Sequence, residues 1–187
     1  MDYRTKPTSR KELRTIAYFI RSFFKCKNKL RFDVVDAFEK MSYLFEGVVT
    51  EIVEDYELPL DIPALCEPDF EGGYIIKVKE SVYDGACKGV GGYRAHILHE
   101  MCHAILCMLG FTPILERTYK NNELKPFESM EWQAKALTGE ILVPYEETKQ
   151  MSINQIMFYC KVSEDCAKKR KSLKWFERRK EKWLVKY

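Results

Sequence analysis

Histidine is scarce in this sequence: only three of the 187 residues are His, and all three lie within residues 96–103. A catalytic zinc ion commonly takes three protein ligands and keeps one coordination position open. His96 lies one turn before His99, but three ligands from one short helix would not surround an ion well. Because no other imidazole exists in the chain, a metal site here takes its third ligand from a carboxylate or a Cys.

Paired cysteines and long apolar runs are also missing. The seven Cys are an odd number and form no C-x-x-C pair, which favours a reducing compartment. No apolar run approaches the ~20 residues that span a bilayer, and the N-terminal MDYRTKPTSRKE is too polar for a signal peptide. We therefore expect a cytoplasmic globular protein, and its 46% hydrophobic content is ample for a core.

The pattern that carries chemistry is H-E-x-x-H, formed by His99, Glu100 and His103. On an α-helix, residues i and i+4 lie about one turn apart on one face, so both imidazoles can bind one metal ion with the carboxylate beside them. Zinc lowers the pKa of a bound water towards ~7 and polarises a carbonyl, and Glu100 is the expected general base. The motif predicts metal-assisted hydrolysis.

The residues around this motif support a helix buried in a domain. Most of them are apolar, Gly91 and Gly92 precede the segment, and Gly110 follows it as a natural end point. The metzincin pattern does not fit, because Leu106 and Leu109 stand where its Gly and third His belong.

The best source of a third ligand is a second segment, from Glu128 to Pro144. Its apolar residues recur at helical spacing, and Pro144 ends the run. Glu131 lies three residues before Ala134, whose small side chain would allow this helix to lie close to the metal helix. Glu128, one turn earlier, is the competing carboxylate, and spacing alone leaves both open.

Together, the two segments resemble the ImmA/IrrE family of zinc metallopeptidases. The resemblance is H-E-x-x-H followed by E-x-x-A-x-x-(apolar)-x-x-x-L-L-M-P, which is matched here by Glu131, Ala134, Leu137, Ile141, Leu142, Val143 and Pro144. Residues 82–100 are also similar to the small residues and Arg that lead into the family's motif. The chain departs from the family at His96 (usually Thr), Leu98 (usually Ala) and Cys102 (usually Gly).

This resemblance implies that Glu131, rather than Glu128, is the third ligand of one Zn²⁺ per chain, in a gluzincin-like site. It also implies an α+β, zincin-like metallopeptidase domain. The implied activity is site-specific cleavage of a transcriptional repressor of the helix-turn-helix class, often encoded beside the peptidase on a phage or other mobile element.

Charge divides the chain into three parts. Residues 1–31 carry a net charge of +8, residues 32–160 carry −12 and residues 161–187 carry +7, which gives the overall +3. We expect a basic N-terminal helix packed on the core (1–31), the metallopeptidase domain (32–148) and a basic, helix-turn-helix-like extension (149–187). Such basic ends could hold nucleic acid, a membrane surface or an acidic partner, or could simply be solvated helix faces.

The segment before the motif predicts a helix and a small sheet. Residues 33–45 have the pattern of an amphipathic helix, and three β-rich runs follow at 48–53, 62–66 and 74–78. In metallopeptidases of this general kind, a sheet edge beside the metal can hold the substrate backbone in extended form. The sequence does not identify which run forms that edge.

Four residues near the motif are candidate substrate or oxyanion contacts, because their donors can assist a developing negative charge. Tyr93, Arg94 and His96 lie at the start of the metal helix, and Tyr119 lies in the loop between the two motif helices.

The C-terminal extension has two short helical patterns that are separated by Val162 and Ser163. Basic residues 168–171 make DNA recognition by the second helix one interpretation. We favour packing or partner docking, because a single unit without an evident dimer interface would bind DNA weakly, and the turn at Lys161 lacks the usual Gly. The alternative to proteolysis is a metal-binding regulator that binds DNA or a repressor through its basic helices.

Overall fold

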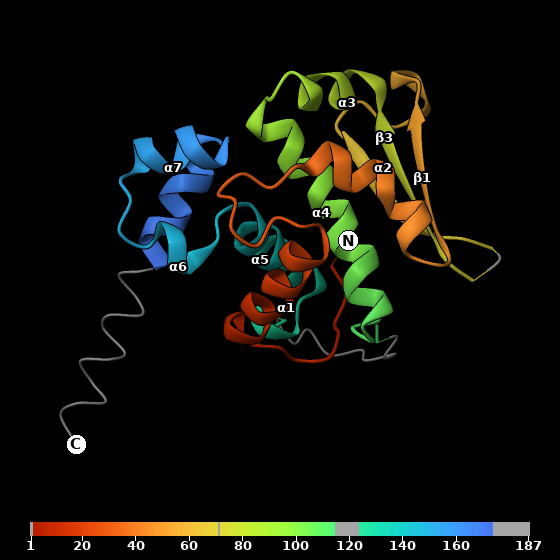
Figure 1. Ribbon diagram of the computed structural model, residues 1–187. Coiled ribbons are helices and arrows are strands. Elements are labelled where there is room, and N and C mark those ends of the chain that lie inside the picture. The colour runs from red at the N-terminus through yellow and green to blue at the C-terminus, as the bar shows by residue number, and fades with distance from the viewer. Residues whose placement is uncertain (1, 71, 115–123, 174–187) are drawn as a thin grey trace.

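The computed structural model describes residues 2–70, 72–114 and 124–173. The fold is α+β: a three-stranded sheet lies at one end, α6 and α7 lie at the other, and α4 and α5 lie between them (Figure 1). The longer helices are α1 (Arg10–Phe23), α2 (Val34–Leu44), α3 (Glu80–Cys87), α4 (Gly91–Met108), α5 (Met130–Leu142) and α7 (Ile153–Cys160). The short ones are η1 (Asp55–Glu57), η2 (Pro126–Glu128) and α6 (Tyr145–Thr148), and residues 164–173 are also helical.

The sheet contains β1 (Val48–Val53), β2 (Ala64–Pro68) and β3 (Tyr74–Lys79) in the order β1-β3-β2. The central strand β3 pairs in parallel with β1 and antiparallel with β2. The runs predicted at 48–53 and 74–78 are confirmed. The run predicted at 62–66 begins too early, because the Ile62 N–H donates to the Pro59 carbonyl in a turn and the strand starts at Ala64.

Helix α4 forms the centre of the core. It packs against α5 on one side and against β2, β3, α2 and α3 on the others. Its buried face is a continuous stripe in which Ile97, Leu98 and Met101 are fully inaccessible to solvent. This burial holds the helix that carries the motif as a rigid element.

The start of α4 differs from the prediction. Gly91 and Gly92 do not precede the helix but form its first turn. A Cβ atom on Gly91 would lie only 2.8 Å from the Ser163 nitrogen and 2.9 Å from the Val162 carbonyl carbon. Glycine is therefore needed because the C-terminal segment crosses directly over the helix at this point.

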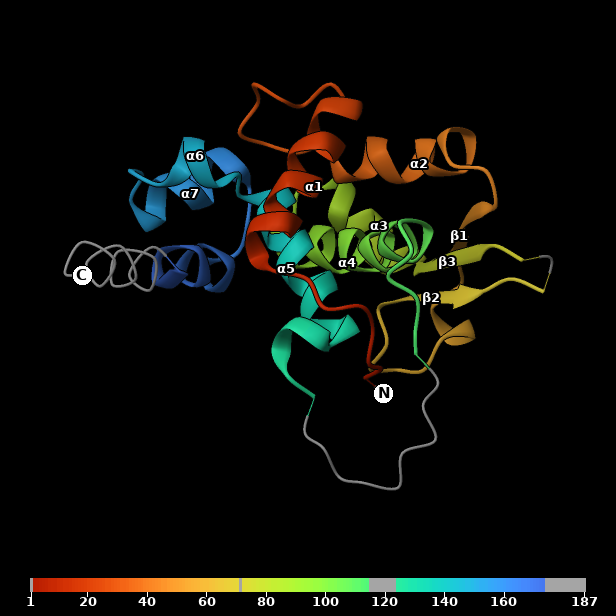
Figure 2. The same cartoon turned by 90° about the horizontal axis from the view of Figure 1, so that it is seen from below.

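Helix α5 is the element on which both basic ends of the chain converge. Helix α1 lies along it (Figure 2), and the side chain of Glu140, which is 0% exposed, accepts hydrogen bonds from three arginines. Arg10 Nη1 lies 3.3 Å and Arg170 Nη1 lies 3.0 Å from Glu140 Oε1, and Arg14 Nε lies 3.1 Å from Oε2. One buried carboxylate thus joins α1 and the helical residues 164–173 to α5.

The two basic ends also share the hydrophobic core with the middle of the chain. Leu13, Ala17 and Ile20 of α1 belong to it, as do Ile156 of α7 and Ala167 of the last described helix. Within the described ranges, no helix combines the length and apolarity that crossing a bilayer requires.

Candidate metal centre

Helix α4 presents His99 and His103 one turn apart on the same face. Their Nε2 atoms are 3.1 Å apart, and their ring centroids lie 4.6 Å apart with the planes at 82°. The side chains keep only 17% and 13% of their surface exposed. The i, i+4 spacing therefore brings the two imidazoles together at the surface of a buried helix.

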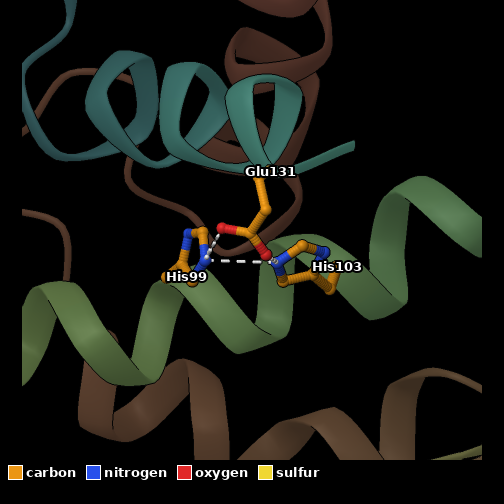
Figure 3. A group of neighbouring side chains, drawn as sticks. All are labelled: His99, His103 and Glu131. Carbon is orange, nitrogen blue, oxygen red and sulfur yellow. Dashed lines mark hydrogen bonds and ion pairs between the residues drawn. The ribbon is translucent and has the colours of Figure 1, made fainter. Parts of the chain in front are cut away.

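Helix α5 brings Glu131 to the two imidazoles from its first turn (Figure 3). The Glu131 carboxylate lies 3.5 Å from His99 Nε2 through Oε2 and 3.1 Å from His103 Nε2 through Oε1. Ala134, one turn later, is fully buried where α5 packs on α4. The cluster consists of His99, His103 and Glu131, and one potential ligand atom from each lies within 4.8 Å of the others.

The turn that carries Glu131 is fixed by side-chain caps. Ser129 is the N-cap, and its Oγ accepts a hydrogen bond of 2.9 Å from the Trp132 N–H. Asp2 adds a second cap, because its Oδ1 accepts from the Glu131 N–H at 3.1 Å and its Oδ2 from Ser129 Oγ at 2.6 Å. Nothing in the sequence pattern indicated Asp2, since it lies far from α5 in the chain.

The spacing of the donor atoms fits a metal ion. A tetrahedral zinc ion with bonds of about 2.0–2.1 Å separates its ligand atoms by about 3.3–3.4 Å. The two Nε2 atoms are 3.1 Å apart, and the nearest Glu131 oxygen is Oε2 at 3.5 Å for His99 and Oε1 at 3.1 Å for His103. A hydrogen bond between the two Nε2 atoms needs one imidazole as the donor and the other as the acceptor. If both Nε2 atoms donated to Glu131, two N–H groups would face each other at 3.1 Å. His99, His103 and Glu131 could therefore hold a metal ion.

The protonation states of the cluster also suit a cation. Burial lowers the pKa of His99 to about 4, His103 adds to the shift, and Glu131 opposes it. Burial likewise lowers the pKa of His103. Burial acts to raise the pKa of Glu131, but the two imidazoles and Lys135, whose Nζ lies 3.2 Å away, lower it on balance. Neutral imidazoles and an ionised carboxylate are the forms that bind metals.

Glu100 is half-buried between α4 and the sheet. Its Oε2 accepts a hydrogen bond of 2.9 Å from the Cys66 N–H of β2. Burial raises the pKa of Glu100 to about 7; the Cys66 N–H lowers it and the charge of Glu131 raises it further. A carboxylate with a pKa near 7 is well matched to accept and return a proton at neutral pH.

The register of β2 explains why Cys66 reaches Glu100. Backbone bonds from Lys79 N to Pro63 O and from Asp69 N to Gly73 O put the odd-numbered residues of this hairpin in hydrogen-bonding pairs with β3. The backbone groups of the even-numbered residues Ala64 and Cys66 therefore point to the free edge of the sheet. Strand β2 is the sheet edge that lies beside Glu100, which the sequence alone did not identify.

Two of the other candidate substrate contacts, Arg94 and Tyr93, lie on α4 and contact neighbouring parts of the chain. Arg94 is wrong as a substrate contact: it is 1% exposed, and its guanidinium donates to the carbonyls of Phe32, Cys160 and Lys161. Tyr93 packs its ring against Gly85 of α3, where a Cβ atom would lie only 2.0 Å from the ring.

His96 is exposed and lines the same cavity as His99, so it stays a candidate contact. Tyr119 lies outside the described residues. Glu128 is in η2, and it is not part of the ligand cluster found among the described residues, to which Glu131 belongs.

A scan against models of protein families found no match for this chain, and neither did a search of curated proteins. The interpretation of the site therefore depends on its own residues and their geometry.

Proposed function

We propose that this chain is a zinc-dependent endopeptidase of the ImmA/IrrE type, with a zincin-like domain. The observation that carries the proposal is the convergence of His99, His103 and Glu131, with Glu100 on the same helix turned towards the sheet edge. Two imidazoles and one carboxylate are a donor set that suits catalytic zinc and leaves a coordination position open. When bound, zinc would supply Lewis-acid polarisation of a carbonyl and a more acidic water.

Glu100 moves the proton in this proposal. It accepts a proton from the attacking water and returns it to the leaving amine nitrogen, which completes hydrolysis of the peptide bond. The Cys66 N–H, at 2.9 Å from Oε2, fixes the orientation of the carboxylate and leaves Oε1 as the proton acceptor. The pKa of Glu100, about 7, suits both the acceptance of the proton from water and its return to the amine nitrogen.

Strand β2 binds the substrate backbone in this proposal. The carbonyls of Ala64 and Cys66 point to the free edge, where they can accept hydrogen bonds from an extended peptide. Pro68 has no N–H, and the Cys66 N–H is engaged by Glu100, so the edge offers mainly acceptors. The substrate is a protein segment, and the resemblance to the family favours a helix-turn-helix repressor of a phage or mobile element in the cytoplasm.

Metal content tests the ligand set. Elemental analysis of protein purified without chelator should give about one zinc per wild-type chain and much less in His103→Ala and Glu131→Ala. Glu128→Ala is the matched control, because it removes a carboxylate from the preceding turn and should leave the zinc content unchanged. A metal-free wild type, or equal loss in Glu128→Ala, would exclude the proposed site.

Glu100→Gln separates proteolysis from the alternative, in which the chain is a metal-binding regulator that acts on DNA or a repressor without cleaving it. This variant should retain zinc and lose hydrolysis of a peptide library followed by mass spectrometry. A biological effect that survives Glu100→Gln would favour the regulator. DNA binding through the second C-terminal helix is less suited to the structure, because Arg170 is buried on Glu140.

A further inference from the structure

A cavity of about 570 Å³ extends from the metal cluster between α4, α5 and the helical residues 164–173. His99 and Trp132 line it at the metal side, and Lys169 and Arg170 line it at the side of the C-terminal helix. The same cavity therefore includes a candidate zinc ligand and part of the basic extension. We call it the basic groove.

Positive charge exceeds negative charge along this groove. Four basic residues line it, namely Arg10, Lys135, Lys169 and Arg170, and Asp165 is the one acidic residue among the lining residues. Glu131 and Glu140 pair with some of these cations, and Arg14 shares Glu140. When Glu131, Glu140 and Arg14 are added to the lining residues, five basic groups stand against three acidic groups, before any metal charge is added. The groove thus favours a negatively charged occupant.

Two of the basic residues keep donors that the described part of the chain does not use. Arg170 is only 4% exposed; its Nη1 and Nη2 donate to Glu140 and to the Gly139 carbonyl, and its buried Nε has no partner among the described residues. Lys169 is exposed and forms no ion pair with any described residue. By contrast, Lys168 on the same helix is paired with Glu164 at 2.9 Å and does not line the groove.

We infer that the basic groove binds an acidic segment of the protein substrate, on one side of the peptide bond to be cleaved. This inference rests on the proposed peptidase function, because the groove extends the same site. Carboxylates of Asp or Glu side chains match the Lys169 ammonium, which has no ion pair among residues 2–70, 72–114 and 124–173. Apolar lining residues such as Trp132 and Leu142 accommodate the backbone and the side-chain methylenes between them. Substrate choice would then depend on acidic residues near the scissile bond.

Peptide binding tests the groove without requiring hydrolysis. Fluorescence anisotropy would compare fluorescein-labelled hexaglutamate with hexaglutamine, on zinc-loaded and on EDTA-treated full-length protein. The wild type should prefer hexaglutamate in both forms. Lys169→Glu should weaken binding about tenfold, whereas the adjacent Lys168→Glu should change it less than about twofold. Higher salt should weaken the wild-type binding.

Three results would overturn the inference: no preference for hexaglutamate, equal weakening by the two lysine variants, or binding that disappears with EDTA and ignores Lys169→Glu. The last result would mean that glutamates bind only the metal. Digestion of a peptide library tests the same inference through cleavage. The wild type should prefer Asp or Glu on one side of the cleaved bond, and Lys169→Glu should lose that preference. If the library is not cleaved at all, the peptidase proposal fails, and the anisotropy measurement still tests whether the basic groove binds acidic peptides.

Discussion

Replacing Glu140 with Gln should destabilise the protein more than any surface charge change. The carboxylate is fully buried and pairs with Arg170, whose side chain is 3% exposed, and with Arg10 and Arg14, whose side chains are about one-quarter exposed. Glutamine removes the negative charge and places an NH₂ donor against guanidinium donors. Arg170 then remains as a buried cation without a counter-ion.

The expected loss follows from that burial. Breaking a buried ion pair by removing one partner costs about 3–5 kcal/mol, because the remaining charge stays desolvated. Arg10 and Arg14 are partly solvated and add little, so we expect the free energy of unfolding to fall by about 3 kcal/mol. Urea unfolding at pH 7, with EDTA in every sample to remove metal effects, measures this change.

Glu146→Gln is the matched control. Its pair with Lys149 is exposed, with side-chain exposures of 66% and 42%, so its loss should change stability by less than about 0.5 kcal/mol. Adding Arg170→Met to Glu140→Gln should restore part of the lost stability, because the stranded cation is removed. A cost below about 1 kcal/mol for Glu140→Gln, or no recovery in the double variant, would refute this account of the cluster.

Three further predictions concern single residues. In metal-free protein, burial raises the pKa of Glu100 to about 7 from an ordinary 4.5, so its contribution to stability is complete below pH 4.5 and is lost, by at most about 3 kcal/mol, as the pH rises through 7. Urea unfolding should therefore show Glu100→Gln gaining stability relative to wild type between pH 5 and pH 8, and a constant difference would contradict the burial. Cys87 is the one exposed thiol of the seven, and burial raises the pKa of the Cys66 thiol to about 12. A thiol reagent at pH 8 should therefore label one Cys rapidly, and Cys87→Ser should abolish that rapid phase of labelling. Lys161 has a φ of 54°, in the left-handed region, so Lys161→Gly should be more stable to urea than Lys161→Ala by about 1 kcal/mol, and the reverse order would contradict the strain.

The sequence predicted those parts of the fold that depend on the spacing of residues within one helix or strand. The i, i+4 spacing of His99 and His103 needs only a helix to bring the imidazoles together, and the apolar residues around them predict that helix. The strands at 48–53 and 74–79 likewise follow from short β-rich runs. Their order was not readable, because which strand lies at the edge is decided by non-local packing against α4.

Arg94 shows where the prediction failed although a signal existed. It lies on the same helical stripe as Ile97, Leu98 and Met101, which is the buried face of α4. Helical periodicity therefore indicated a buried Arg, whose donors must be satisfied internally. The structure satisfies them with backbone carbonyls of Phe32 and the C-terminal segment. Proximity to the motif favoured a substrate contact, and the periodicity was the better guide.

Helix α5 connects the stability of the fold to the geometry of the metal cluster. Its first turn carries Glu131 and is capped by Ser129 and Asp2, and its last turn carries Glu140, which binds the arginines of both basic ends. An α-helix is stiff over this length, so the two turns move together. The C-terminal segment contacts both helices, at Gly91 of α4 and at Glu140 of α5, so it helps to fix the distance between Glu131 and the two imidazoles on which the proposed metal site depends.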